Sequence, residues 1–440
     1  MTDLEPEIRR IGAELHAALP GAAAHPIRTA DTRAMELAAR DRDLRAALFR
    51  FVDVVPACRS IDDVARHLSA FLADVPAAPS PVEAARRAAG TRPGRAALGA
   101  IAAGGVRHMA HRFIVGADPE RALPVLADLW RDGVASSVDL LGEATVTAAE
   151  ADRYAARCRD ALERIAAAAR DWPSRPALES DGAGPLPRAN VSVKVSALTP
   201  LLRPDAPARG RDDAAGRLRA LLRRARELGA HVHVDMESLD SREAVTELVL
   251  MLLAEPEFRH GPSAGVVLQA YLRDSGEQLD DLLAWVRATD RRPPLTVRLV
   301  KGAYWDHELV EAVQHGWRPP VFEAKAECDR NFELLTRRLL GARPHIRVAI
   351  ASHNLRSVAH AVAAAGEGTD LELQVLRGLG DELAEALARH GLRVRAYCPV
   401  GDLVAGMAYL VRRLLENTSN ESFLHEQARG TPLETLLAAP

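Results

Sequence analysis

The sequence predicts a distorted (βα)8 barrel preceded by an α-helical arm, with the arm and a linker over 1–117 and the barrel domain over 118–440. The chain has 440 residues, of which 48% are hydrophobic, enough to bury a large core. Beyond about residue 120, eight short apolar segments alternate with amphipathic helical segments, the rhythm of βα units. No G-x-G-x-x-G motif follows any of them, so an open dinucleotide-binding sheet, the structural alternative, lacks its usual signature.

The arm is expected to be helical from Glu5 to about Leu72. This stretch is rich in alanine, leucine and arginine, with apolar residues at helical spacing, and it contains no convincing strand. Proline and glycine then interrupt the pattern, first around 75–81 and again at Thr91-Arg-Pro-Gly94. We therefore expect a linker or an exposed crossing over 74–96.

The candidate strands are short runs of apolar residues at 136–141, 191–196, 231–236, 265–271, 295–300, 346–352, 371–375 and 392–398. Helical patterns between them include 148–170, 212–228, 242–253, 279–288 and 381–390. Eight such strands over about 280 residues fit a closed barrel better than an open sheet. The carboxyl ends of the strands would then form the mouth, where barrel enzymes carry their active sites.

Composition excludes several classes of protein. The net charge is −3 and no basic run is interleaved with aromatic residues, so nucleic acid is not an expected partner. No stretch of about 18 apolar residues occurs and Met1–Arg10 does not resemble a signal peptide, so we expect a cytoplasmic protein with at most a peripheral membrane contact. Cys58, Cys158, Cys328 and Cys398 lack C-x-x-C spacing, which predicts free thiols and no metal site.

Lysine is rare in this chain. Only Lys194, Lys301 and Lys325 occur among 57 lysines and arginines, and the first two fall at strand ends. Lys194 lies inside the apolar strand Val191-Ser-Val-Lys-Val-Ser196, where a charge needs a buried partner. A structural ion pair is one explanation for Lys194, and a functional group at the barrel mouth is the other.

Polar residues gather at the other strand ends as well. They are Asp139, Glu143, Asp235, Glu237, Gln269, Arg298, Ser352, His353, Asn354, Gln374 and Tyr397. In a barrel these positions converge at the mouth, so they are the candidates for catalysis and binding.

A final helix is expected from a cap at Asp402 to about Glu416. Tyr409, Arg412, Arg413 and Glu416 stand at i, i+3, i+4 and i+7, and so share one face. A solvated polar face is the ordinary explanation, but leucines and valine occupy the rest of the circumference. Paired arginines above a barrel mouth are suited to clamp a carboxylate, because a guanidinium donates two parallel hydrogen bonds.

Together these segments resemble the proline dehydrogenase family, especially the catalytic module of bacterial bifunctional proline-utilisation flavoenzymes. The matching segments are Val138-Asp-Leu-Leu-Gly-Glu143, Val191-Ser-Val-Lys-Val-Ser-Ala197, Val234-Asp-Met-Glu237, Leu268-Gln-Ala-Tyr271, Arg298-Leu-Val-Lys-Gly-Ala-Tyr-Trp-Asp306, Ala351-Ser-His-Asn354, Tyr397-Cys-Pro-Val-Gly401 and Tyr409-Leu-Val-Arg-Arg-Leu-Leu-Glu-Asn417. They occur in the family's order. The family fold is a distorted (βα)8 barrel with its last helix over the mouth, in agreement with the pattern above.

The resemblance implies FAD-dependent oxidation of L-proline to pyrroline-5-carboxylate. It assigns catalysis to Asp235 and Arg298, and substrate binding to Lys194, Tyr397, Tyr409, Arg412 and Arg413. The cofactor contacts that it implies are Met236, Gln269, Arg298, Lys301, Gly302, Ala303, Trp305, Ser352, His353, Gln374 and Glu416. Electrons would pass from the flavin to a quinone, and no metal is required.

Bifunctional relatives carry an aldehyde dehydrogenase module after the barrel, for which the residues beyond Asn417 leave no room. The chain is therefore either a stand-alone enzyme or a module of a longer protein, and its abrupt ending favours the second. Two other functions remain open on the sequence. Lys194 could serve a Schiff-base aldolase on the same barrel, or the barrel could be a non-catalytic scaffold with the arm as its interaction surface.

Overall fold

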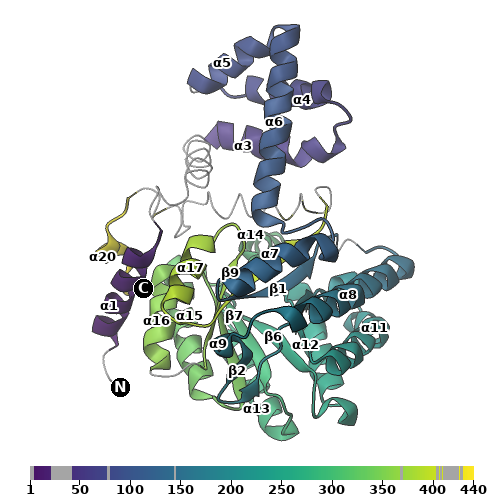
Figure 1. The fold of residues 1–440 in the computed structure, drawn as a ribbon, viewed down its shortest axis with the longest axis vertical. Coiled ribbons are helices and arrows are strands. Elements are labelled where there is room, and N and C mark those ends of the chain that lie inside the picture. Colours follow the sequence, from purple (N-terminus) through teal and green to yellow (C-terminus); the bar gives the residue numbers. More distant parts are fainter. Residues whose placement is uncertain are drawn as a thin grey trace.

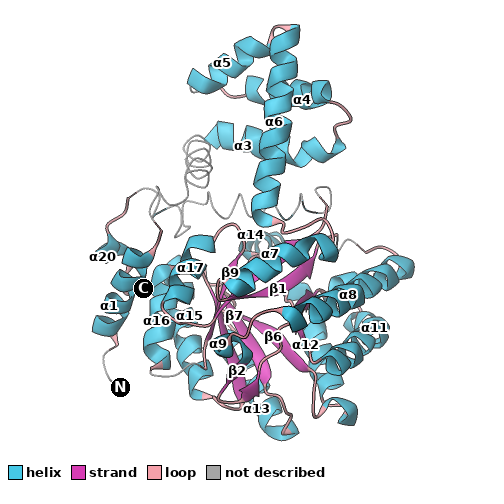
Figure 2. Ribbon diagram, in the orientation of Figure 1, coloured by secondary structure: helices cyan, strands magenta, loops and turns pink. Residues whose placement is uncertain are grey.

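The computed structural model describes residues 4–20, 42–76, 80–142, 145–366, 370–402, 406, 409, 426 and 430–440. Eight parallel strands close into a barrel in the order β1-β10-β9-β8-β7-β6-β5-β4 (Figures 1 and 2). They are β1 (Val134–Leu140), β4 (Asn190–Val193), β5 (His231–Val234), β6 (Ser263–Gln269), β7 (Leu295–Val300), β8 (Ile346–Ala351), β9 (Glu372–Leu376) and β10 (Val394–Val400). The predicted (βα)8 fold and its eight strands are confirmed, and the bounds of β7 are those predicted.

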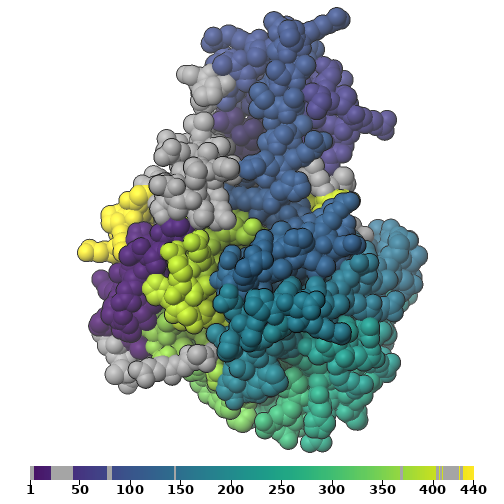
Figure 3. All heavy atoms as spheres, in the orientation of Figure 1, coloured from purple at the N-terminus to yellow at the C-terminus, as the bar shows by residue number. Residues whose placement is uncertain are grey.

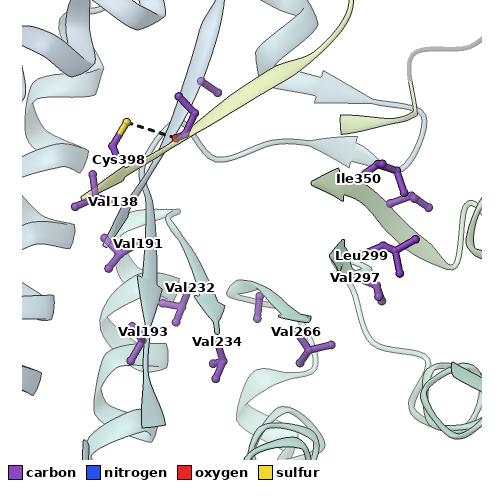
Figure 4. Packing of buried hydrophobic residues seen from close by; sticks show 14 of the residues in the cluster. Val138, Val191, Val193, Val232, Val234, Val266, Val297, Leu299, Ile350 and Cys398 are labelled. Carbon is purple, nitrogen blue, oxygen red and sulfur yellow. Dashed lines mark hydrogen bonds between the residues drawn. The ribbon is translucent and has the colours of Figure 1, made fainter. Parts of the chain in front are cut away.

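The two faces of the strands differ in chemistry. One set of alternate positions is apolar and packs into the main core against the surrounding helices; Figure 4 shows Val191, Val193, Val232 and Val234 among them. The alternate positions face the barrel axis and are mostly polar, as with Ser192 in β4. This pattern leaves a hydrogen-bonding interior in place of the branched apolar residues that usually fill such a barrel.

Helices surround the strands and start at clear signals in the sequence. They are α7 (Pro119–Arg131), α8 (Ala148–Ala168), α10 (Val195–Leu198), α11 (Pro207–Leu228), α12 (Leu239–Leu253), α13 (Ser275–Thr289), α14 (Trp305–His315), α15 (Lys325–Gly341), α16 (Leu355–Ala365) and α17 (Asp381–Arg389). Thr147 caps α8 in a capping box with Glu150, and Asp118 caps α7 ahead of a proline in the first turn. These caps satisfy amides that the helix itself leaves unpaired.

Four helices stand apart from the barrel and form their own small core. They are α3 (Arg42–Val54), α4 (Ile61–Ala73), α5 (Ser80–Ala89) and α6 (Arg92–Phe113), packed through Leu44, Phe51, Leu68 and Val106 among others. Figure 3 shows them projecting from the barrel body. The prediction of a linker over 74–96 is wrong. Thr91 caps α6, and Pro93 lies in the first turn of that helix, where proline favours a helix.

The first helix, α1 (Glu5–Ala18), does not belong to this group. Its apolar face, with Ile8, Ile11 and Leu15, joins the barrel core beside α16, and Glu5 accepts from Arg356 at 2.7 Å. Arg356 also donates to the carbonyl of Leu437, next to α20 (Leu433–Leu436), so the two ends of the chain meet on α16 (Figure 1). The helical content predicted for the arm is confirmed where described, but the arm is not one continuous unit.

A short hairpin of β2 (Ser180–Asp181) and β3 (Gly184–Pro185), which the sequence did not predict, precedes β4. It lies by the amino ends of the barrel strands, which we call the floor, since Asp181 binds Arg347, the second residue of β8. None of the helices described is long and apolar enough to cross a bilayer.

Candidate active site

Inward-facing residues at the carboxyl ends of the strands converge on one carboxylate, that of Asp235. Asp235 directly follows β5, Arg298 lies in β7 and Tyr397 in β10. Arg298 Nη1 donates to Asp235 Oδ1 at 2.7 Å, and the Tyr397 hydroxyl donates to Oδ2 at 2.6 Å. Asp235 and Arg298 are 8% and 5% exposed, so this charge pair is screened little by water.

Lys194 joins the same cluster from the end of β4. Its ammonium group donates to Asp139 Oδ1 at 2.5 Å and lies 3.5 Å from both Asp235 Oδ2 and the Tyr397 hydroxyl. The lysine therefore does have the ion-pair partner that its burial requires, and the pair lies beside Asp235 at the mouth. The ammonium donates to a carboxylate in an ion pair, an arrangement unlike the free amine that a Schiff-base nucleophile requires.

Asp139 is one of the polar residues at the strand ends to which the sequence assigns no role. It lies in β1, is 1% exposed and supplies the carboxylate for Lys194. The signal that could have found it is the one that identified Lys194, a charged residue within an apolar strand. Lys194 and Asp139 are thus one unit of the site.

Tyr397 is protonated in this setting. Burial, followed by the negative charges of Asp139 and Asp235, raises its pKa well above the ordinary tyrosine value. The phenol therefore remains a donor to Asp235, and its ring lies 5.5 Å from the Arg298 guanidinium carbon in a cation–π contact. This stacking gives the mouth one rigid aromatic wall.

Two buried polar atoms at the mouth have no partner among the described residues. They are Arg298 Nε and Gln269 Oε1, and the Gln269 amide nitrogen is already fixed by donation to the carbonyl of Glu237 at 2.9 Å. Buried polar groups without partners are uncommon, and such atoms at a strand end indicate a place for a polar ligand. Met236, partly buried next to Asp235, supplies an apolar contact nearby.

The loop after β7 makes a tight turn. Gly302 has φ +133°, and a Cβ there would lie 2.3 Å from the ring of Tyr271, so only glycine fits. Burial lowers the pKa of Lys301, although its ammonium pairs with Asp329, which Lys325 also contacts at 2.5 Å.

The next residues of this loop lie in the open. Ala303 is exposed, and Trp305, at the start of α14, is 37% exposed with its indole N–H donating to the carbonyl of Phe322 at 2.9 Å. They offer an accessible amide and an accessible ring face to an extended ligand.

The predicted residues on β8 and β9 fall in two places. Ser352 and His353 follow β8 at the mouth, where Ser352 Oγ accepts from the amide of Asn354 and His353 Nε2 accepts from the amide of Leu376. Gln374 instead turns toward the floor, donating to Glu372 at 2.6 Å and lining a small cavity there. Gln374 is therefore not grouped with the other predicted cofactor contacts.

The expected last helix is described only in part. Tyr409 is helical and 6% exposed, and it packs with Phe113, Ile114 and Leu141 between α6 and the end of β1. Arg412, Arg413 and Glu416 lie outside the described residues, as does Glu143.

Two family models match the chain. Residues 122–426 match the family model of proline dehydrogenase, and residues 5–113 match that of the proline utilization A N-terminal domain. The proline dehydrogenase of Deinococcus radiodurans is 31% identical over 329 residues, which cover 72% of this chain and 89% of that protein. The bifunctional protein PutA of Klebsiella aerogenes is 33% identical over 346 residues, which cover 76% of this chain and 25% of that protein.

A solved structure is similar over the whole chain. Proline utilization A from Bdellovibrio bacteriovorus, inactivated by N-propargylglycine, superposes with a TM-score of 0.89 at 36% identity, covering 100% of this chain and 44% of that one. The chain thus spans about a quarter of the bifunctional curated relative and less than half of this solved one. The resemblance expected from the motifs is confirmed: the chain belongs to the proline dehydrogenase family.

Proposed function

We propose that this chain oxidises L-proline to pyrroline-5-carboxylate with FAD as cofactor. The observation that carries the proposal is the cluster of Lys194, Asp235 and Arg298, all buried, with the partly buried Tyr397, at the carboxyl ends of four strands. It combines a cation for the substrate carboxylate, an aromatic wall for its ring and a fixed guanidinium beside them. Membership of a flavin-dependent family supports the choice of reaction.

Lys194 is the proposed anchor for the substrate carboxylate. Its position at the mouth leaves it between Asp139 and Asp235, and a bound carboxylate would add a third anionic neighbour. The paired arginines Arg412 and Arg413 are proposed to supply the remaining positive charge, as their spacing on the predicted last helix suggests. Tyr397 and Tyr409 would then pack against the pyrrolidine ring.

Asp235 and Arg298 are proposed to organise the reacting atoms. Once the ring nitrogen has lost a proton, its lone pair forms the C=N bond as the C5 hydride is transferred, so the ring must be held with C5 facing the acceptor. Asp235 holds Lys194, Arg298 and Tyr397 in register, because all three contact its two oxygens. The buried setting excludes water from the reacting centre and preserves the strength of these charges.

The residues present fit a flavin. Arg298 Nε and Gln269 Oε1 are a donor and an acceptor without protein partners, suited to the polar edge of an isoalloxazine. Lys301 and the glycine turn at Gly302 suit a pyrophosphate, with Ala303 and Trp305 next along the chain. Met236, Ser352, His353 and Glu416 complete the proposed contacts, without Gln374, which turns toward the floor. When bound, FAD would supply the hydride acceptor, N5 of its ring.

The test is an absorbance spectrum of the purified protein with and without proline. We expect flavin bands, and anaerobic addition of L-proline should bleach them as pyrroline-5-carboxylate accumulates. The Bdellovibrio relative is inactivated by N-propargylglycine, so the same compound should bleach this protein irreversibly. A colourless protein that binds no added FAD, or a yellow one whose bands proline leaves unchanged, would refute the proposal.

A quinone is the proposed electron acceptor. After anaerobic bleaching by proline, a soluble quinone analogue should restore the flavin bands faster than oxygen does. Recovery with oxygen alone, and none with the quinone, would assign a different acceptor without affecting the first half-reaction.

A further inference from the structure

A chain of hydroxyl and amide groups lies beneath Arg298 inside the barrel. Arg298 Nη2 donates to Ser192 Oγ at 3.3 Å, Ser192 Oγ lies 3.0 Å from Ser137 Oγ, and Ser137 Oγ donates to Asn190 Oδ1 at 2.7 Å. Ser192 is 0% exposed and Ser137 is 1% exposed. These are inward-facing positions of β4 and β1.

The bond from Ser137 to Asn190 sets the direction of the hydrogen bonds along this chain. Ser137 uses its only proton toward Asn190, so it must accept the proton of Ser192. The lone pairs of Ser192 are then left for Arg298 Nη2. A hydroxyl that donates on one side is a better acceptor on the other, so the chain strengthens the contact to the guanidinium.

Ser192 completes a two-point hold on Arg298. Among the described residues, Nη1 is bound by Asp235 and Nη2 by Ser192, while Nε has no partner. Two contacts to two different nitrogens fix the plane of a guanidinium, whereas one contact leaves it free to rotate. The neighbouring His233 adds no competing positive charge, because burial, and then Arg298 itself, lowers its pKa well below the usual histidine value.

We propose that Ser192 is a positioning residue for proline oxidation: it fixes the orientation of Arg298 from below, and Ser137 and Asn190 orient its hydroxyl. The inference rests on the proposed function, since it requires Arg298 to act in the reaction. A purely structural role for Ser192 would change stability without changing the rate of the chemical step.

The first experiment is Ser192→Ala in the flavin-loaded protein. Anaerobic stopped-flow reduction by proline should slow about tenfold, a typical loss for one hydrogen bond to a charged group, while the apparent affinity for proline changes less than twofold. Ser263→Ala is the matched control, because Ser263 is another buried inward serine, bonded to His231 and not to Arg298. It should reduce at the wild-type rate.

Ser192→Cys separates the effect of losing the hydroxyl group from the effect of leaving an empty space at this position. A thiol fills the site but accepts hydrogen bonds weakly, so this variant should be nearly as slow as the alanine variant. Wild-type rates in Ser192→Cys or in Ser192→Ala would overturn the positioning role. If the alanine variant fails to fold, the cysteine variant alone decides.

A double-mutant cycle with Arg298→Lys separates the two proposals. If Ser192 acts through Arg298, Ser192→Ala should change the rate less than twofold in the lysine background. A full tenfold loss in that background would overturn the positioning role while leaving the dehydrogenase proposal intact. A wild-type rate in Arg298→Lys alone would instead remove Arg298 from the proposed reaction.

Discussion

The two ends of the barrel interior both carry buried charges, but the charges are used differently. At the floor, Arg347 forms a bidentate pair with Asp181 at 2.9 and 3.1 Å, and Arg395 forms another with Glu372 at 2.9 Å for both contacts. Burial raises the pKa of Glu372, but Arg395 outweighs it and lowers the pKa to about 2. At the mouth, three different residue types meet on the single carboxylate of Asp235.

The difference shows which feature of a buried charge indicates function. At the floor, the arginines donate to carboxylates and to backbone carbonyls of the hairpin, such as that of Pro185. These contacts close the barrel around a cavity of about 30 Å³. At that volume the cavity has room for little more than water. Both ends keep buried atoms without a partner among the described residues, Arg347 Nη1 at the floor and Arg298 Nε and Gln269 Oε1 at the mouth. The mouth differs because Lys194, Arg298 and Tyr397 share the carboxylate of Asp235. Burial and charge alone do not separate these two ends.

The floor should respond to mutation through stability. Arg347→Met leaves the buried Asp181 carboxylate with the amide of Ala183 at 3.0 Å and, among the described cations, the more distant Arg393 at 3.7 Å, so the free energy of unfolding should fall by about 3 kcal/mol. Turnover per folded, flavin-loaded molecule should be unchanged. Denaturant unfolding and kinetics measure the two effects.

The matched control for the floor is Arg164→Met, which breaks exposed pairs with Asp160 and Glu120 and should change the free energy of unfolding little. If Arg347→Met is as stable as that control, or if it loses turnover while remaining folded, the distinction between floor and mouth is wrong.

At the mouth, mutation should change the rate of the reaction. Asp235→Asn keeps the shape of the side chain but removes the charge that orients Arg298, Lys194 and Tyr397, so flavin reduction by proline should slow about a hundredfold. The deciding measurement is the rate of reduction in the folded, flavin-loaded variant, because the buried Arg298 guanidinium also loses the carboxylate that pairs with it. A variant that reduces normally would show that the carboxylate only packs the mouth.

Much of this architecture could be predicted from sequence because burial leaves a strong pattern. Strands such as β7 (Leu295–Val300) are nearly continuous apolar runs bounded by breakers. The β2–β3 hairpin could not be predicted, because strands of two residues are too short to show a periodic pattern. The prediction of a linker over 74–96 is wrong because it takes proline as the end of a helix, whereas Pro93 lies in the first turn of α6.

The site shows the same division. Lys194 and Arg298 could be identified because a charge inside an apolar strand is conspicuous. Ser192 could not, since an isolated serine in a strand carries no signal of what it will contact. The turn of Gln374 toward Glu372 depends on the side chains of neighbouring strands, which the local sequence does not determine.

Acid should destabilise the fold through two buried histidines, His231 and His233, in the barrel interior. Burial, and then Arg395 for His231 and Arg298 for His233, lowers the pKa of both histidines well below 6.5 in the folded protein. Below pH 6.5 the unfolded chain therefore binds more protons, so stability is full above that pH and is lost as the pH falls. Each histidine contributes up to about 1.4 kcal/mol per pH unit.

Replacement of these histidines tests that slope. Urea unfolding of His231→Gln/His233→Gln between pH 7 and pH 5 should show a shallower loss of stability than the wild type, whatever the absolute stability of the variant. Equal slopes would mean that groups elsewhere dominate the acid response.

The smallest effect that we predict is one of substrate choice at the aromatic wall of the mouth. We place the Tyr397 ring against the side of the pyrrolidine where a 4-hydroxyl would project. Tyr397→Ser should make room for that hydroxyl and offer it a partner, so kcat/KM for 4-hydroxyproline should rise about tenfold relative to proline. Tyr397→Phe is the control, because it removes the hydrogen bond to Asp235 but keeps the ring. If the ring excludes the hydroxyl, the phenylalanine variant should slow both substrates and keep the wild-type ratio, whereas an equal ratio in all three proteins would place the ring away from C4.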